Sequence, residues 1–251
     1  MQAILSALAE QHAQLSRLLE PLDATGWRRP TRCDGWDVAD VVLHLAQTDE
    51  LALASVEDRF AEELQVLGGG LDGQGNVDDG AAAIVARERG ASDSELLQRW
   101  RSTATSLRDA FAGADSHRRV RWVSGLLSVH TLATTRLAES WIHTGDVADA
   151  LGVEQQPTEG LEHIARLAWR TLPYAFERDG RRLSGPVAFD LRSPNGTRWH
   201  FVPDGEPLTV IEGSGAELCA VAARRTPPDE TSLRGTGPDA EAVLALVRTY
   251  A

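Results

Sequence analysis

The hydrophobic periodicity of the chain changes near Pro157, and this change limits the possible folds more than any other feature. Before it, apolar residues recur every three or four positions over long segments, which places them on one face of an α-helix. After it, residues 187–192 alternate between apolar and polar as a strand does, and turn residues follow them. We therefore expect a multi-domain protein, with an all-helical bundle over residues 1–152 and a small α+β domain over residues 158–251.

The helices expected in the first domain cover residues 1–20, residues 38 to about 59 or beyond, residues 81–112 and residues 129–151, and a second helix is expected to start within the third segment at Ser92 or Asp93. Asp37 is a favourable N-cap for the second helix, and Gly152 a favourable end for the last. Residues 118–125 are expected to form a short, irregular segment. The glycine-rich run Gly68–Gly80 is expected to be a mobile connector or a lid.

In the second domain, Thr158 is expected to cap a helix that continues to about Ala175. Strands are expected at residues 187–192, 197–202, 208–211 and 232–235, and the first two are joined by a turn at Pro194-Asn-Gly196. Two further helices are expected over residues 213–225 and 238–250.

The composition excludes several classes of function. The net charge is −12, and a surface this acidic repels nucleic acid and anionic lipid. All 25 basic residues are arginines, so no lysine is present for a Schiff base or a phosphate loop. No apolar run approaches the roughly 20 residues that span a bilayer, and the first ten residues lack a basic signal-peptide region. We expect a cytoplasmic monomer or homodimer.

Most of the cysteines and histidines have simple interpretations. Cys33 and Cys219 lie far apart in the sequence, which favours two small buried hydrophobic residues over a disulfide framework. His130 lies half a turn away from the helix face of Glu139 and is not counted as a ligand. The histidines expected to be surface or capping residues are His12, His117, His163 and His200.

Glu139 and His143 are the strongest candidates for chemistry in the first domain. They are four residues apart in an expected helix, so both side chains point from the same face. His44 flanks an apolar stripe on another expected helix. A Glu–His pair on a solvated helix face, and a core histidine whose hydrogen bonds are made inside the protein, would give the same patterns. Helix bundles, however, also build metal sites from facing helices, and two imidazoles with one carboxylate suit catalytic zinc or non-haem iron.

Two motifs resemble those of a known family. Residues 27–45 read W-x-x-P-T-x-C-x-G-W-x-V-x-D-x-x-x-H-L, and residues 139–147 read E-x-x-x-H-x-x-D-V. Both resemble signatures of the mycothiol-dependent maleylpyruvate isomerase family, which belongs to the DinB-like helical metalloproteins. Residues 213–225 are similar to that family's small C-terminal domain, which resembles sterol-carrier proteins. The resemblance extends over nearly the whole chain.

The resemblance assigns roles to particular residues. His44, Glu139 and His143 match the family's three metal ligands, and the metal there is usually zinc. Asp146 matches a position from which a carboxylate orients His143, although a solvent-exposed aspartate is an alternative. Arg224 or Arg225 lies near a family arginine that meets the anionic substrate or the thiol, although a favourable charge at a helix C-terminus is an alternative.

The resemblance implies a zinc (or other divalent metal) enzyme that activates mycothiol for addition to an electrophilic small molecule, as an S-transferase or a cis–trans isomerase. This function requires a groove with polar and cationic groups suited to the thiol. One alternative is a metal-dependent hydrolase, whose general base would be Asp146, Asp40 or Asp49. The other is a non-catalytic protein that binds a metal or a small ligand, with a dry pocket or no open coordination position. The sequence leaves the electrophilic substrate unidentified.

Overall fold

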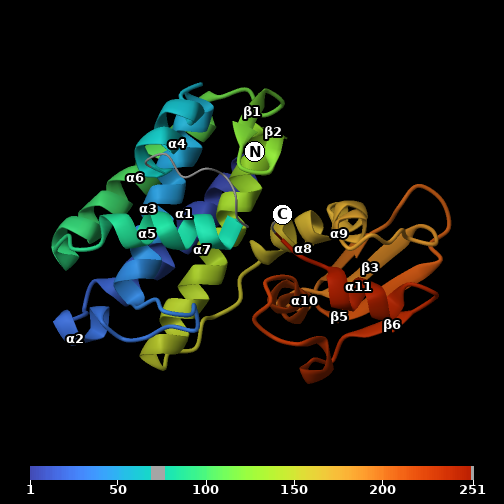
Figure 1. The fold of residues 1–251 in the computed structure, drawn as a ribbon. Helices are drawn as coiled ribbons and strands as arrows, with labels where there is room; N and C mark the ends of the chain where they lie inside the picture. Colours follow the sequence, from blue (N-terminus) through green and yellow to red (C-terminus); the bar gives the residue numbers. More distant parts are fainter. Residues whose placement is uncertain (69–76, 250–251) are drawn as a thin grey trace. The chain divides into compact units, whose positions relative to one another are not determined.

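The computed structural model describes residues 1–68 and 77–249, and the chain divides into two units, residues 1–155 and 156–251. The division falls in the connector between the two expected domains. The first unit is mainly helical, whereas the second combines helices with a four-stranded sheet (Figure 1). The expected fold class is therefore confirmed. No helix within the described ranges is long and apolar enough to cross a membrane.

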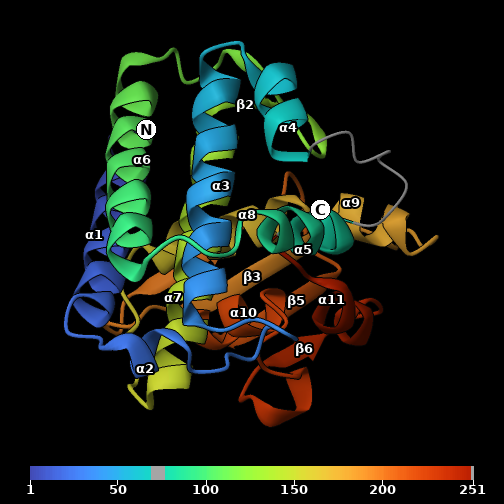
Figure 2. The same ribbon diagram turned by 60° about the vertical axis from the view of Figure 1, so that its left-hand side comes forward.

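Four long helices form a bundle in the first unit: α1 (Gln2–Leu19), α3 (Val38–Val56), α6 (Asp93–Gly113) and α7 (Val129–Leu151). Helix α3 packs against α6 and α7, and α1 packs against the same two helices (Figure 2). The short helix α2 (Ala24–Trp27) precedes α3. Helices α4 (Phe60–Gly68) and α5 (Val77–Glu88) both contact α3.

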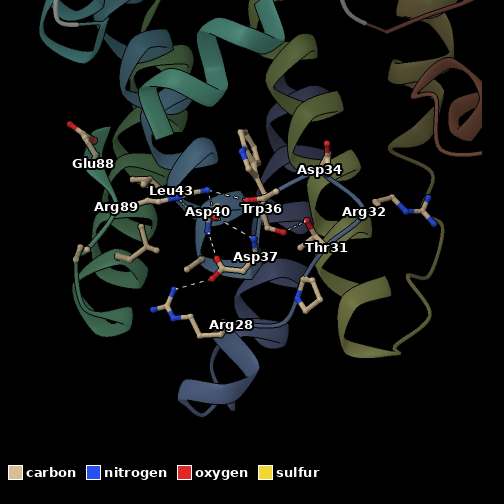
Figure 3. A pocket seen from close by; sticks show the side chains of 16 residues that line it. Arg28, Thr31, Arg32, Asp34, Trp36, Asp37, Asp40, Leu43, Glu88 and Arg89 are labelled. Carbon is tan, nitrogen blue, oxygen red and sulfur yellow. Dashed lines mark hydrogen bonds and ion pairs between the residues drawn. The ribbon is translucent and has the colours of Figure 1, made fainter. Parts of the chain in front are cut away.

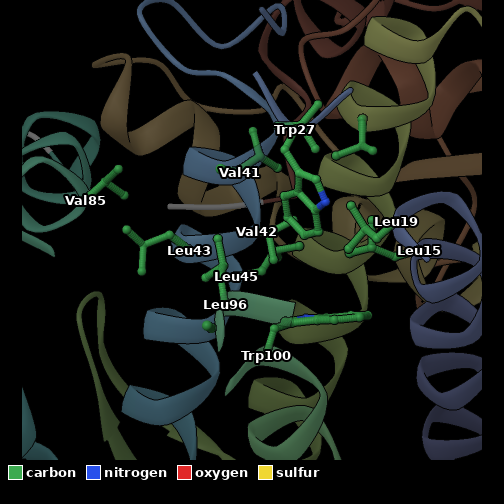
Figure 4. Packing of buried hydrophobic residues seen from close by; sticks show 14 of the residues in the cluster. Leu15, Leu19, Trp27, Val41, Val42, Leu43, Leu45, Val85, Leu96 and Trp100 are labelled. Carbon is green, nitrogen blue, oxygen red and sulfur yellow. The ribbon is translucent and has the colours of Figure 1, made fainter. Parts of the chain in front are cut away.

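Local signals in the sequence fix the ends of the bundle helices. Asp37 and Asp40 form a reciprocal capping box at the start of α3, and Ser92 does the same with Glu95 at the start of α6. Gly152 ends α7 in the left-handed conformation, with φ at 71°. Between the helices lies a buried apolar cluster (Figure 4), whose largest members include Leu15, Trp27, Val42, Leu45, Leu96 and Trp100.

Two expectations for the first unit need correction or completion. Residues 118–125 are not irregular, because β1 (Arg119–Trp122) and β2 (Gly125–Ser128) pair as an antiparallel hairpin that packs on α3 and α7. Val120 is buried, and Gly125 supplies the positive φ of the turn. Helix α5 begins at Val77, before the expected start at Ala81. Residues 69–76, the central part of the Gly68–Gly80 run, lie outside the described residues.

The sheet of the second unit has the order β4-β3-β5-β6. Strands β3 (Val187–Arg192) and β4 (Arg198–Phe201) form the expected antiparallel hairpin. Strand β5 (Thr209–Ser214) runs parallel to β3, and β6 (Arg234–Thr236) runs antiparallel to β5.

The expected helix over residues 158–175 is broken into α8 (Leu161–Arg170) and α9 (Leu172–Arg178). Pro173 explains the break, because proline is tolerated in the first turn of a helix and not in its interior. Gly160, and not Thr158, is the N-cap of α8. The remaining helices are α10 (Gly215–Ala222), a 3-10 turn (Pro228–Glu230) and α11 (Ala240–Leu246).

Candidate metal centre

The packing of α3 against α7 brings the three candidate ligands together. His44 lies on α3, two turns after the capping box at Asp37, and its side chain is buried. Glu139 and His143 lie one turn apart on α7, so their side chains project from one face. His143 is also buried, whereas the Glu139 side chain is 24% exposed. The site therefore has one side that is open to solvent.

The distances between the ligand atoms suit a single ion. Glu139 Oε2 lies 3.6 Å from His143 Nε2 and 3.8 Å from His44 Nε2, and the two imidazole rings are 5.0 Å apart. One donor atom from each residue lies within 4.8 Å of the other two. Tetrahedral zinc with bonds of about 2.0–2.1 Å separates its ligand atoms by about 3.4 Å. The donor types and the spacing both fit a divalent metal.

Asp146 holds the other nitrogen of His143. Its Oδ2 lies 2.9 Å from His143 Nδ1, and its side chain is only 1% exposed. The alternative of a solvent-exposed aspartate is therefore wrong. A carboxylate in this position keeps Nδ1 protonated and leaves Nε2 directed toward Glu139, the arrangement that commonly orients metal-binding histidines.

Cys33 is the neighbour that the sequence interpretation missed. Its Sγ donates to Asp146 Oδ2 at 3.3 Å and lies 4.0 Å from His143 Nδ1. The residue is only partly buried, so the interpretation as a small buried hydrophobe applies to Cys219 and is incomplete for Cys33. Cys33, His143 and Asp146 form a second group with a spacing that suits a metal. Its place in the P-T-x-C-x-G-W motif, beside the expected ligand helix, was the available signal.

The side chains of the site are electrostatically polarised. Burial would raise the pKa of Glu139, but the nearby rings of His143 and His44 outweigh it and hold this pKa well below its usual value. Burial lowers the pKa of His143, yet its contacts with Asp146, Cys33 and Glu139 prevail and raise this pKa well above its usual value. Burial also lowers the pKa of His44. Glu139 is thus an anion and His44 is neutral, the two forms that ligate metals, whereas the raised pKa of His143 means that its ring gives up a proton when an ion binds.

A polar pocket of about 840 Å³ is lined by the loop before α3 and by the first turns of that helix (Figure 3). Trp36 lines this pocket, and its ring lies 5.1 Å from the ring of His44. Arg89 also lines the pocket and donates two hydrogen bonds to the carboxylate of Asp40, forming a bidentate ion pair. The lining also includes Arg28, Arg32, Thr31, Asp34, Asp37 and Glu88. The three ligands themselves are not part of the lining, so Trp36 is the link between pocket and site.

The other candidate residues lie elsewhere. Asp49 is fully buried and pairs with Arg136. Arg224 and Arg225 follow α10 in the second unit, which is described separately. Arg224 is exposed and donates to the carbonyl oxygen of Ala245 at 2.7 Å, and Arg225 donates to the carbonyl oxygen of Ala223 at 3.1 Å.

The histidines expected at the surface differ in their burial. His117 and His200 are exposed as expected, and His163 is half-buried. The expectation for His12 is wrong, because this side chain is 5% exposed and contacts Ser140 and Arg108. His12 continues the apolar stripe of α1 at the position between Leu8 and Leu15, and this spacing was the signal available in the sequence.

Comparison with known proteins gives consistent results. The family described as the mycothiol maleylpyruvate isomerase N-terminal domain matches residues 8–148. Two uncharacterized proteins of Mycobacterium tuberculosis, from strains CDC 1551 / Oshkosh and H37Rv, are each 31% identical over 245 residues, which cover 97% of this chain and 93% of theirs.

Two solved structures have a similar fold. They are the mycothiol-dependent maleylpyruvate isomerase and a histidine-to-alanine mutant of it, each with a TM-score of 0.61 and 18% sequence identity. The mutant's match covers 95% of both chains, and the other covers 94% of this chain and 92% of that one. At this identity the likeness concerns the fold, and it extends over both units.

Proposed function

The chain belongs to the mycothiol maleylpyruvate isomerase family, and from this premise we propose that it is a metal-dependent enzyme that activates a low-molecular-weight thiol. The thiol is mycothiol, and it adds to an electrophilic small molecule. The main support for the proposal is the convergence of His44, Glu139 and His143, with one ligand atom from each within 4.8 Å of the others. These residues hold zinc or another divalent ion.

A divalent ion with an open position supplies one chemical property, the stabilisation of a bound thiol as the nucleophilic thiolate at neutral pH. The side of the site where Glu139 is partly exposed gives the thiol access. In a transferase, the sulfur forms a C–S bond that remains in the product. In an isomerase, the sulfur adds to an electron-poor double bond, the resulting single bond rotates, and the thiolate leaves with the electron pair of the C–S bond.

Other residues of the chain have supporting roles in this proposal. Asp146 orients the His143 ring through the contact of 2.9 Å with Nδ1. The pocket beside Trp36 offers the polar and cationic groups expected for binding the polar part of the thiol. Arg224 or Arg225 neutralises a carboxylate of the electrophile, a role that rests on the family resemblance.

The alternatives have less support. A hydrolase needs a free base beside the site, but each of the three expected carboxylates has a partner: Asp146 contacts His143, Asp40 binds Arg89 and Asp49 binds Arg136. A non-catalytic metal protein would saturate or enclose its ion, whereas the described ligands number three and Glu139 is partly exposed.

Metal analysis and a thiol titration test the proposal. We expect one divalent ion per chain, and we expect mycothiol to add a thiolate-to-metal absorption band to the cobalt-substituted protein. A loaded protein whose spectrum does not respond to mycothiol would contradict thiol activation.

The ligand assignment is tested by His143→Ala, which should lose the metal and lower the melting temperature, because metal binding stabilises the fold. His117→Ala, which removes an exposed histidine from the same unit, is the matched control and should retain the metal. Stoichiometric metal in His143→Ala would refute the assignment.

A further inference from the structure

Arg136 is an arginine in an unusual environment. It lies on α7, three residues before Glu139, and its side chain is 1% exposed. Its Nε donates to Asp49 Oδ1 at 2.9 Å, and one terminal nitrogen donates to Thr48 Oγ1 at 2.8 Å. Both partners lie on α3, so these hydrogen bonds connect the two helices that provide the ligands.

The connection reaches the backbone of a ligand residue. Thr48 lies one turn after His44, and its hydroxyl donates to the carbonyl oxygen of His44 at 2.7 Å. The hydroxyl thus accepts from Arg136 and donates to His44. On the other helix, Arg136 and Glu139 lie on the same face, because residues three apart are neighbours on a helix. Arg136 therefore lies about one turn from the ligand Glu139 on α7, and its partner Thr48 lies one turn from the ligand His44 on α3.

Stability alone does not account for this buried pair. Asp49 is fully buried, and its Oδ2 has no hydrogen-bond partner among the described residues. Removing two charges from water costs about as much as their attraction returns, and apolar residues of similar volume often serve at least as well. Leu45 on α3 and Leu132 on α7 are both fully buried nearby. An apolar pair in place of Asp49 and Arg136 would therefore extend packing that already exists between the two helices.

We propose that Arg136, held by Asp49 and Thr48, is a positioning residue that sets the spacing and register of α3 against α7 so that His44 and Glu139 meet at the metal-binding separation. Metal sites need their ligands held to about 0.5 Å, which a directional, two-point hydrogen bond achieves better than apolar contact. This inference rests on the metal site of the proposed function.

The test separates positioning from stability. The double variant Arg136→Met/Asp49→Leu removes both charges and leaves neither partner unpaired. We expect it to fold and to bind cobalt 10- to 100-fold more weakly than the wild type, about the loss that follows removal of groups supporting metal ligands. Its cobalt absorption spectrum should also change, because the ligand geometry is relaxed.

Two further variants complete the experiment. Thr48→Val removes only the hydroxyl that joins Arg136 to His44, and it should weaken cobalt binding in a chain that keeps its ion pair. Arg99→Met is the matched control, because Arg99 binds Glu50, the next residue of α3, from α6 instead of α7. This control should keep the wild-type cobalt affinity and spectrum.

Wild-type cobalt affinity and spectrum in the folded double variant would overturn the inference, as would equal losses in the double variant and Arg99→Met. If the double variant does not fold, an unchanged affinity in Thr48→Val overturns it. A wild-type protein that binds no cobalt refutes the proposed function first, which distinguishes the two failures.

Discussion

Lowering the pH from 7 to 5 should destabilise the protein through His12, a buried histidine of α1. Its Nδ1 accepts a hydrogen bond from Arg108 at 2.6 Å, and its Nε2 lies 3.2 Å from Ser140 Oγ. Burial first, and then the positive charges of Arg108 and Arg136, lower the pKa of His12 from 6.5 to about 3. A proton on Nδ1 would meet the Arg108 guanidinium directly, so the folded protein keeps this ring neutral.

The sign follows from proton linkage. The unfolded chain binds a proton at His12 as the pH falls through 6.5, whereas the folded chain does so only near pH 3. Unfolding therefore takes up a proton between these values, and stability falls with pH in that window. One pH unit within the window corresponds to about 1.4 kcal/mol, so the change from pH 7 to pH 5 costs about 2 kcal/mol.

Urea denaturation of the metal-free protein at pH 7, 6 and 5 measures this cost. The wild type should lose about 2 kcal/mol more of its unfolding free energy over this range than His12→Gln, whose side chain does not titrate. The other histidines contribute equally to the pH dependence of both proteins, so their contributions cancel in the difference. His117→Gln, at an exposed position, should behave as the wild type does. Equal pH slopes for the wild type and His12→Gln would refute the reasoning.

Two other substitutions have defined outcomes. Asp146→Asn keeps the shape of the side chain but removes the negative charge beside the ring of His143. It should weaken zinc binding about 10- to 100-fold in a chelator competition. An unchanged zinc affinity would count against the orienting role of Asp146. Gly237→Ala should destabilise the second unit by about 1–3 kcal/mol in urea, because Gly237 has a φ of 100° and an added Cβ would collide with the backbone of Leu208. Gly196→Ala shares the positive φ without the collision, so a loss as large as that of Gly237→Ala would exclude the steric explanation.

Much of the helical unit could be predicted because its signals are local. The capping residues Asp37 and Ser92, and the terminal Gly152, act within one turn of the helix ends that they determine. The spacing of Glu139 and His143 is likewise a property of one helix. The convergence of these two residues with His44 came from the family resemblance, since no local pattern specifies which helices face each other.

The features that were missed depend on distant partners. The hairpin around Gly125 has strands of only four residues, and it forms where they pack on α3 and α7. The burial of His12 depends on Ser140, 128 residues away, and the pairing of Arg136 with Asp49 spans 87 residues. A single sequence shows the residue types but not the partner that makes a buried charge tolerable.

X-ray absorption at the zinc edge, recorded before and after mycothiol is added, tests the central claim most directly. We predict two imidazole nitrogens and carboxylate oxygen around the ion in the thiol-free protein, and a new zinc–sulfur distance of about 2.3 Å once mycothiol is present. Cys33→Ser should give the same two spectra, because the new sulfur belongs to mycothiol. Two results would contradict the account. One is a zinc–sulfur distance already present in the thiol-free wild type and lost in Cys33→Ser, which would place the ion at Cys33, His143 and Asp146. The other is the absence of any zinc–sulfur distance after mycothiol is added.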